Sequence, residues 1–503
     1  MHAQLASHCS ARTPAEHALY RRALAEDDAV DGATFLRDAK YWLVLSLLGA
    51  AVTGVCFLAL FRSFARVTVW GIVYLKVATL AAVSLLAATA GGPAAGVPVM
   101  VLALLSAFVF WLWREEIDLV ARLLAVASKA LQDNPHLITA TVFLKTLLLC
   151  FLVPLAAFVT AAYTNGGVEV NPEAVMSRGG AGAADTCTTE AGEPTACCVW
   201  RVKTWAGAYI ALASLAGLWT VTLAFEARMF TIAGAVAQWY FAVPGTTDYK
   251  GTTIGALRHA FGPSFGSLCF GSLVIAAVSV AREMNRSAGR DARRSAGGGA
   301  ALLVCLLSSC LDCLYALVEY ISKFATIQCA ITGAAFCDAA RSVSRLLADN
   351  FLSAYGVWWL PGTILGAASF VLSAAYGALV GLSSYATWTS APRGEHPAAG
   401  TNAVVLGVIA FVLALVILQF CVSVLLNVVD AVFVCYAMDL DRQLSSKPEV
   451  HDVLTAVHQK RARAVGGGSR GGSLRAGGAV VQAPDGQLLY GRYAAPPTIE
   501  EEA

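Results

Sequence analysis

The amino-acid sequence predicts an all-α fold, a polytopic transmembrane helix bundle of about nine to ten spans. Of its 503 residues, 57% are hydrophobic and only 14% are charged, whereas soluble domains carry about 25% charged residues. The apolar residues form runs long enough to cross a bilayer, which takes roughly 20 residues per helix. These runs are 41–61, 67–90, 97–113, 137–162, 204–242, 264–284, 300–333, 357–383 and 402–437. Two of them, 204–242 and 300–333, are longer than one crossing requires, so each is expected to be tilted, broken or partly re-entrant.

The order of polar and apolar sequence predicts three parts. A polar N-terminal segment, residues 1–40, is expected outside the cell and lacks the apolar core of a signal peptide. The transmembrane domain follows over residues 41–437. Residues 438–503 are expected to be a flexible cytosolic tail, because 464–478 consist mainly of Gly, Ser and Arg.

The distribution of basic residues predicts the orientation, since cytoplasmic loops are enriched in Lys and Arg. Basic residues flank the loop after the first span and occupy segment 114–136, which is therefore placed in the cytoplasm as a loop. The acidic loop 163–203 is placed outside and the basic tail inside. Segment 282–299 carries five arginines although the count of crossings places it outside, so its side stays open.

Composition and motifs also exclude several classes of function. A net charge of +2, spread between apolar runs, gives no reason to expect a nucleic-acid partner. The sequence contains no phosphate-binding loop of an ATPase, no Gly-x-Ser-x-Gly elbow and no zinc-protease motif. The chain is therefore predicted not to be an enzyme and to need no cofactor or metal.

Most of the 14 cysteines lie in apolar runs, where they act as small hydrophobic residues. Cys187, Cys197 and Cys198 lie instead in the polar loop 163–203. If that loop faces an oxidising compartment, we expect Cys187 to pair with Cys197 or with Cys198.

Ionisable residues inside apolar runs are the candidate functional residues, because a charge in a membrane helix faces a partner or a water-filled path. Asp312, Tyr315, Glu319 and Lys323 share one helical face. One interpretation is a structural Glu319–Lys323 pair one turn apart. The other is that Glu319 and a neighbouring tyrosine hold a cationic substrate.

Two more polar lines follow the same logic. Asp430 ends a line of polar residues in the last span, for which interhelical hydrogen bonding is the structural alternative. Glu226 lies on a line in run 204–242 with Thr222, Phe230, Gly234 and Gln238, each four residues apart, and Trp239 and Tyr240 close that run. These two aromatics are expected either to form an interfacial belt or to form an aromatic box for a quaternary ammonium.

Residues 311–350 also resemble the signature region of the choline transporter-like family, which has an LE-x-x-x-KF step followed by G-x-x-FC-x-x-A-x-x-x-x-x-LL-x-x-N. The matching residues are Val318, Glu319, Lys323, Phe324, Gly333, Phe336, Cys337, Ala340, Leu346, Leu347 and Asn350. Residues 233–241 resemble the AG-x-x-A-x-WYF run of the family. Residues 429–442 resemble its terminal VDT-x-x-x-CF-x-EDLER, although a single Asp439 stands where the family usually has a Glu–Asp pair.

The resemblance, over roughly residues 35–445, implies a multi-pass transporter of choline or a similar ammonium compound such as ethanolamine, in the plasma membrane or an organelle membrane. The candidate substrate-binding residues are Glu226, Trp239, Tyr240, Tyr315, Glu319 and Asp430. We expect alternating access with the substrate near mid-membrane, and the bilayer and a small organic cation as the only partners. The oligomeric state stays open.

Three alternatives accompany this prediction. The family includes carriers of other solutes, so a thiamine compound is an alternative substrate. A membrane scaffold without transport is the alternative from another class. The first span of the family has no counterpart here, which favours a gene model that lacks its start over a naturally short member.

Overall fold

In a computed structural model, helices make up nearly all of the chain that can be described. The described residues are 14–91, 93–171, 175–177, 186–188, 198–242, 251–295, 298–349, 351–390, 399–442, 446, 447 and 450. Their helices are α2 (Pro14–Gly91), α3 (Pro93–Leu112), α4 (Arg114–Asp133), α5 (His136–Tyr163), α6 (Thr204–Phe241), α7 (Thr252–Ala260), α8 (Phe265–Ser295), α9 (Gly298–Thr332), α10 (Phe336–Asp349), α11 (Phe351–Ser390) and α12 (Ala399–Asp441). The predicted all-α polytopic fold is confirmed.

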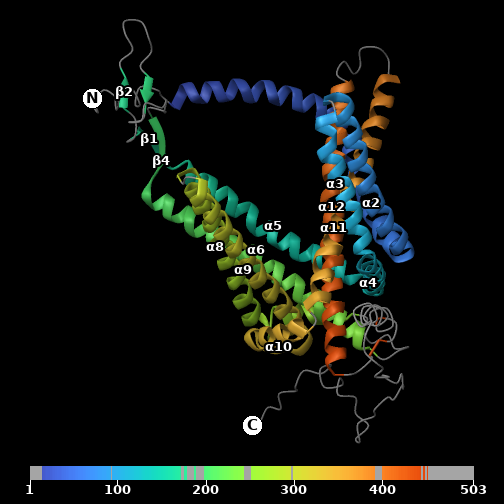
Figure 1. Cartoon of the computed structure of the whole chain (residues 1–503). Helices are drawn as coiled ribbons and strands as arrows, with labels where there is room; N and C mark the ends of the chain where they lie inside the picture. The colour runs from blue at the N-terminus through green and yellow to red at the C-terminus, as the bar shows by residue number, and fades with distance from the viewer. Residues whose placement is uncertain are drawn as a thin grey trace, which may run out of the picture.

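The spans form two groups that lean against each other (Figure 1). One group contains α2, α3, α11 and α12, and the other contains α5, α6, α8 and α9. Helix α12 belongs to the first group but also packs against α6 and α9 of the second. The main hydrophobic core lies at this junction, where α12 buries Leu425 and Val432 against Ile232 of α6 and Phe324 of α9.

The number of spans depends on two bends. In the described part of the chain, seven helices are long and apolar enough to cross a membrane, or eight if α3 and α4 together make one bent span. The first of the seven, Ala39–Thr89, has 51 residues, or roughly 76 Å of helix, more than twice the hydrocarbon thickness. Its backbone leaves helical geometry at Phe64. The two halves on either side of Phe64 correspond to the predicted spans 41–61 and 67–90.

Two segments that the sequence assigns to loops are helical. Segment 114–136, predicted as a cytoplasmic loop, contains α4, which buries Ile117, Leu124 and Leu131 in the main core. Segment 282–299 contains the C-terminal turns of α8, which continues to Ser295. Helix α10 is short and lies across the ends of the neighbouring spans (Figure 1).

The end of α9 shows why the chain turns there. Gly333 has a φ of +72°, the left-handed conformation that ends a helix at little cost only for glycine. Its N–H still donates to the carbonyl of Cys329 at 2.8 Å. The chain then enters α10 in a new direction.

The strands and the C-terminal end of α12 lie at opposite ends of α6. Strand β1 (Gly166–Val170) pairs antiparallel with β4 (Cys198–Val202), directly before α6 begins. Strands β2 (Val175–Ser177) and β3 (Thr186–Thr188) form a second antiparallel pair in the same loop. Tyr240 and Asp439 meet at the other end of α6.

The α8–α9 hairpin shows on which side segment 282–299 lies. Helix α8 runs antiparallel to α6, since Leu268 packs near Phe230 whereas Ser272 contacts Trp219 and Thr222. The tip of the hairpin therefore lies at the strand end of the bundle (Figure 1). The arginines of this segment are on the same side as loop 163–203.

Candidate functional site

An ion pair joins the two groups of helices in the buried interior. Lys323 of α9 donates its Nζ to Oδ2 of Asp430 of α12. The Asp430 side chain is 6% exposed and that of Lys323 is 21% exposed. Because α9 and α12 belong to different groups, this pair is a direct electrostatic link across their junction.

A second carboxylate lies beside this pair without a hydrogen-bonding partner. Glu226 of α6 is 0% exposed; its neighbours on α9 are the Lys323 ammonium and the Thr326 hydroxyl, which lies close to the carboxylate without hydrogen-bond geometry. Among the described residues, none donates a hydrogen bond to either carboxylate oxygen of Glu226. A buried charge in this condition is costly unless a further group compensates it.

Uncharged polar side chains extend the same region. Ser322 and Thr326, one helical turn apart on α9, are buried, and neither hydroxyl has a hydrogen-bonding partner among the described residues. Asn427 of α12 is 3% exposed, and its Nδ2 likewise lacks an acceptor there. The sequence analysis assigned no role to Ser322 or Thr326. Their spacing of four residues, parallel to that of Glu319 and Lys323, is the signal that would have identified them.

Gln419, at the start of the polar line of α12, has a structural role. Gln419 donates its Nε2 to Ser369 Oγ of α11 at 3.0 Å. This is the interhelical hydrogen bonding given above as the structural alternative. Only the end of the line, at Asn427 and Asp430, belongs to the candidate site.

Helix α6 also carries a buried cation that the sequence analysis did not consider. Arg228 is 7% exposed, and its guanidinium lies 4.9 Å from the ring centroid of Phe225. Its charge repels that of Lys145 of α5, whereas Glu226 faces α9. Since two residues correspond to about 200° of rotation on a helix, Arg228 points away from the site and does not neutralise Glu226.

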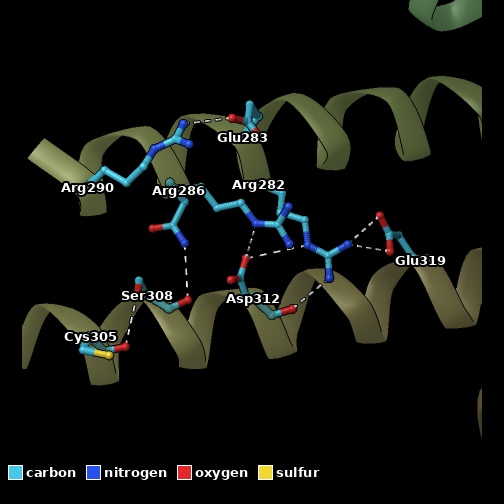
Figure 2. Close-up of polar contacts among 9 residues, drawn as sticks. Arg282, Glu283, Arg286, Arg290, Cys305, Ser308, Asp312 and Glu319 are labelled. Carbon is cyan, nitrogen blue, oxygen red and sulfur yellow. Dashed lines mark hydrogen bonds and ion pairs between the residues drawn. The ribbon is translucent and has the colours of Figure 1, made fainter. Parts of the chain in front are cut away.

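Glu319 is paired with α8, so the predicted alternative of a Glu319–Lys323 pair is wrong. Arg282 Nη1 donates to both carboxylate oxygens of Glu319, at 3.2 and 3.0 Å. Figure 2 shows that Arg282 also lies against Asp312, at 3.6 Å between Nε and Oδ1, and that Arg286 approaches the same oxygen at 3.9 Å. The rotation of α9 directs Glu319 to α8 and Lys323 to α12. Tyr315, on the same helix, is half-buried.

Trp239 and Tyr240 lie at the far end of α6 from the strands. Both are buried, at 2% and 0% exposure. Trp239 Nε1 donates to Asp133 Oδ2 at 2.9 Å, and the Tyr240 hydroxyl donates to Asp439 Oδ2 at 3.2 Å. Trp239 follows Glu226 by 13 residues, or roughly 20 Å along the helix. The six predicted residues therefore occupy three places, and Glu226 and Asp430 are linked through Lys323, which interacts with both.

The disulfide candidates lie at the strand end of the molecule. Cys187 is buried in β3 and is disulfide-bonded. Cys197 and the side chain of Cys198 lie outside the described residues. The choice between them as the partner of Cys187 stays a prediction. Among the side chains described, no three of His, Cys, Asp and Glu are grouped to hold a metal ion.

The match with a protein family covers the whole candidate site. The model of the family described as plasma-membrane choline transporter matches residues 97–441, from α3 to the last residue of α12. The chain belongs to this family. The matched region contains Glu226, Lys323 and Asp430, so the three charged groups lie on the part of the chain that the family shares.

Individual relatives are distant and are covered in part. The chain is 25% identical over 245 residues to a CTL-like protein of Dictyostelium discoideum, and the match covers 46% of this chain and 39% of that protein. It is 26% identical over 236 residues to protein pns1 of Aspergillus fumigatus, 47% of this chain and 43% of the relative. It is 29% identical over 136 residues to choline transporter-like protein 5 of Mus musculus, and this match covers 27% of this chain and 19% of the relative. The chain thus spans less than half the length of these three relatives.

Proposed function

We propose that the chain transports choline, or a related quaternary or primary ammonium compound such as ethanolamine, across the plasma membrane or an organelle membrane by alternating access. The family description and the name of the mouse relative support the substrate class. The observation that carries the proposal is the buried carboxylate of Glu226, which has no hydrogen-bonding partner among the described residues and lies beside the Lys323–Asp430 pair.

The charges at this place favour a monovalent cation. Two carboxylates, Glu226 and Asp430, face one ammonium group, that of Lys323. When both carboxylates are ionised, one negative charge is left over in a buried region, where compensation is worth far more than in water. A methylated ammonium supplies one positive charge and loses little hydration on burial, because its methyl groups already keep water at a distance. The site therefore suits choline in both charge and polarity.

The position of the pair also suits alternating access. Lys323 belongs to the group of α5, α6, α8 and α9, and Asp430 to that of α2, α3, α11 and α12 (Figure 1). Rocking of one group against the other would separate the two charges, whereas the substrate would compensate Asp430 when Lys323 moves away. Motions of this kind around a mid-membrane site are common among secondary transporters. In this mechanism Lys323 takes the place of the substrate in the empty carrier.

The experiment is uptake of labelled choline by cells that lack a choline carrier of their own. The wild-type chain should give saturable uptake, and Glu226→Gln should lower it at least tenfold, since removing one partner of a buried charge pair costs roughly 3–5 kcal/mol. Glu283→Gln is the matched control, because Glu283 is exposed and pairs only with Arg290. Equal uptake by the two variants would show that Glu226 does not bind the substrate.

The same cells separate the alternatives. Excess unlabelled choline should displace the label, and thiamine should not. Displacement by thiamine alone would favour a different solute. If the folded protein reaches the membrane and no saturable uptake is found for any ammonium compound, the non-transporting scaffold is favoured.

A further inference from the structure

The chain places one of its own ammonium groups on a buried tryptophan. Lys447 Nζ lies 3.5 Å from the centroid of the Trp239 ring. The same Nζ donates a hydrogen bond to the backbone carbonyl of Trp239 at 3.0 Å. This is the geometry of a cation–π contact, in which an ammonium group lies over the negative face of the ring. The ring is 2% exposed, so the contact is shielded from water.

The residue before Lys447 is fastened to the same end of the bundle. Asp439, 1% exposed, accepts hydrogen bonds from the backbone N–H of Ser446 at 2.9 Å and from its hydroxyl at 2.8 Å. The hydroxyl of Tyr240 donates to the same carboxylate. The segment 446–447 after α12 is thus held against the end of α6, and Lys447 is directed onto the indole ring.

The surroundings of the ring keep it fixed. The indole N–H of Trp239 donates to Asp133 of α4, which orients the ring plane. Asp133 thus places a carboxylate at the edge of the ring. A fixed aromatic face with a carboxylate nearby is a site that suits an ammonium ion of any origin.

We propose that the face of Trp239 is a second ammonium-binding site, and that Lys447 of the chain's own tail occupies it until a soluble methylated ammonium displaces it. The inference rests on the proposed function, because the soluble ligand is the transported cation. The site lies roughly 20 Å along α6 from Glu226, at the end of the bundle remote from the strands. It is therefore distinct from the site at Lys323 and Asp430.

The competition has a calculable consequence. A side chain tethered by a few residues acts at a high effective concentration. If only a fraction of molecules have an unoccupied ring, the apparent dissociation constant of a soluble ligand rises by the inverse of that fraction. Removing the Lys447 ammonium should therefore strengthen binding of the soluble cation, about tenfold if one molecule in ten has the ring free.

The first test measures the half-saturating choline concentration for uptake by the full-length chain. Lys447→Gln should lower it about tenfold, whereas Lys447→Arg, which keeps a cation over the ring, should retain the higher value of the wild type. In a Trp239→Leu background, Lys447→Gln should have no further effect. An unchanged value in Lys447→Gln, or the same change in Lys447→Arg, would overturn the proposal.

The second test uses the purified full chain and does not depend on transport. Tetramethylammonium chloride should raise the unfolding temperature more for Lys447→Gln than for the wild type or Lys447→Arg, with sodium chloride at equal ionic strength as the reference. Equal shifts for all three would contradict the second site. So would a Lys447→Gln protein that does not fold, since Lys447 would then be a structural residue. Absence of choline uptake by the wild type, with the tetramethylammonium difference present, would instead count against the proposed function alone.

Discussion

The Lys323–Asp430 pair predicts an asymmetric response to loss of its two charges. Lys323→Met leaves Asp430, 6% exposed, without its ion-pair partner and the buried Glu226 without its neighbouring cation. Asp430→Asn leaves Lys323 beside Glu226, which is already its electrostatic neighbour. The lysine variant should therefore be the less stable of the two, although each removes one member of the same pair.

The magnitudes follow from burial. Breaking a buried ion pair by removing one partner costs about 3–5 kcal/mol. We expect about 3 kcal/mol for Lys323→Met, at the low end of this range because the pair is partly accessible from the lysine side. For Asp430→Asn we expect about 1–2 kcal/mol, since Lys323 keeps a carboxylate neighbour. The double variant should be more stable than Lys323→Met alone by about 1–2 kcal/mol, because one of the two uncompensated charges is gone.

The assay is the free energy of unfolding of the purified full-length chain in detergent micelles, measured for the wild type, both single variants and the double variant. Two results would refute the reasoning. One is a cost for Asp430→Asn equal to or larger than that for Lys323→Met. The other is a double variant whose loss equals the sum of the two single losses.

Three further predictions concern the helix junctions. Gly377→Ala should destabilise the chain by about 1–3 kcal/mol, because the added Cβ would lie 2.7 Å from a backbone oxygen of α12. Thermal unfolding should show no such loss for Gly366→Ala, because a Cβ at Gly366 meets no atom within 4 Å. Arg282→Gln should lower the free energy of unfolding by about 1–3 kcal/mol, since it leaves two carboxylates of α9 without their bridging cation. Arg290→Gln removes a cation from an exposed pair and should change stability by less than about 0.5 kcal/mol. Equal losses for the two variants would show that the bridge is unimportant. Tyr240→Phe should cost about 1–3 kcal/mol in the same measurement, because it removes a donor to a buried carboxylate; a neutral substitution would mean that the hydrogen bond contributes little.

The sequence was sufficient for the helices that bury apolar surface in lipid. Each predicted span lies within a helix except for at most one residue at an end, because a run of about 20 apolar residues crosses a bilayer most stably as a helix. Segment 114–136 was predicted as a loop since its charges indicated water. The structure shows instead that its apolar residues, Ile117 and Leu124 among them, follow a helical period and pack into the core.

The candidate site could be predicted only in part. Glu226 and Asp430 stand out because a carboxylate within an apolar run needs a reason, and the structure brings both to Lys323. The partners of Glu319 and Lys323 could not be chosen from spacing, since each side chain can reach a neighbour on its own helix or on another. That choice depends on the rotation of α9 between α8 and α12, which is set by tertiary packing. The separation of Trp239 from Glu226, by contrast, follows from the sequence, since 13 residues of one helix span roughly 20 Å.

The central claim is that a positive charge on the substrate is what the buried carboxylates recognise. The most direct measurement compares inhibition of labelled choline uptake by unlabelled choline and by 3,3-dimethyl-1-butanol, which has the same shape with carbon in place of the charged nitrogen. The account predicts that choline competes and that the neutral alcohol does not, even at a concentration 100 times higher, since an uncompensated buried charge is worth about 3 kcal/mol or more. Equal inhibition by the two compounds would contradict it.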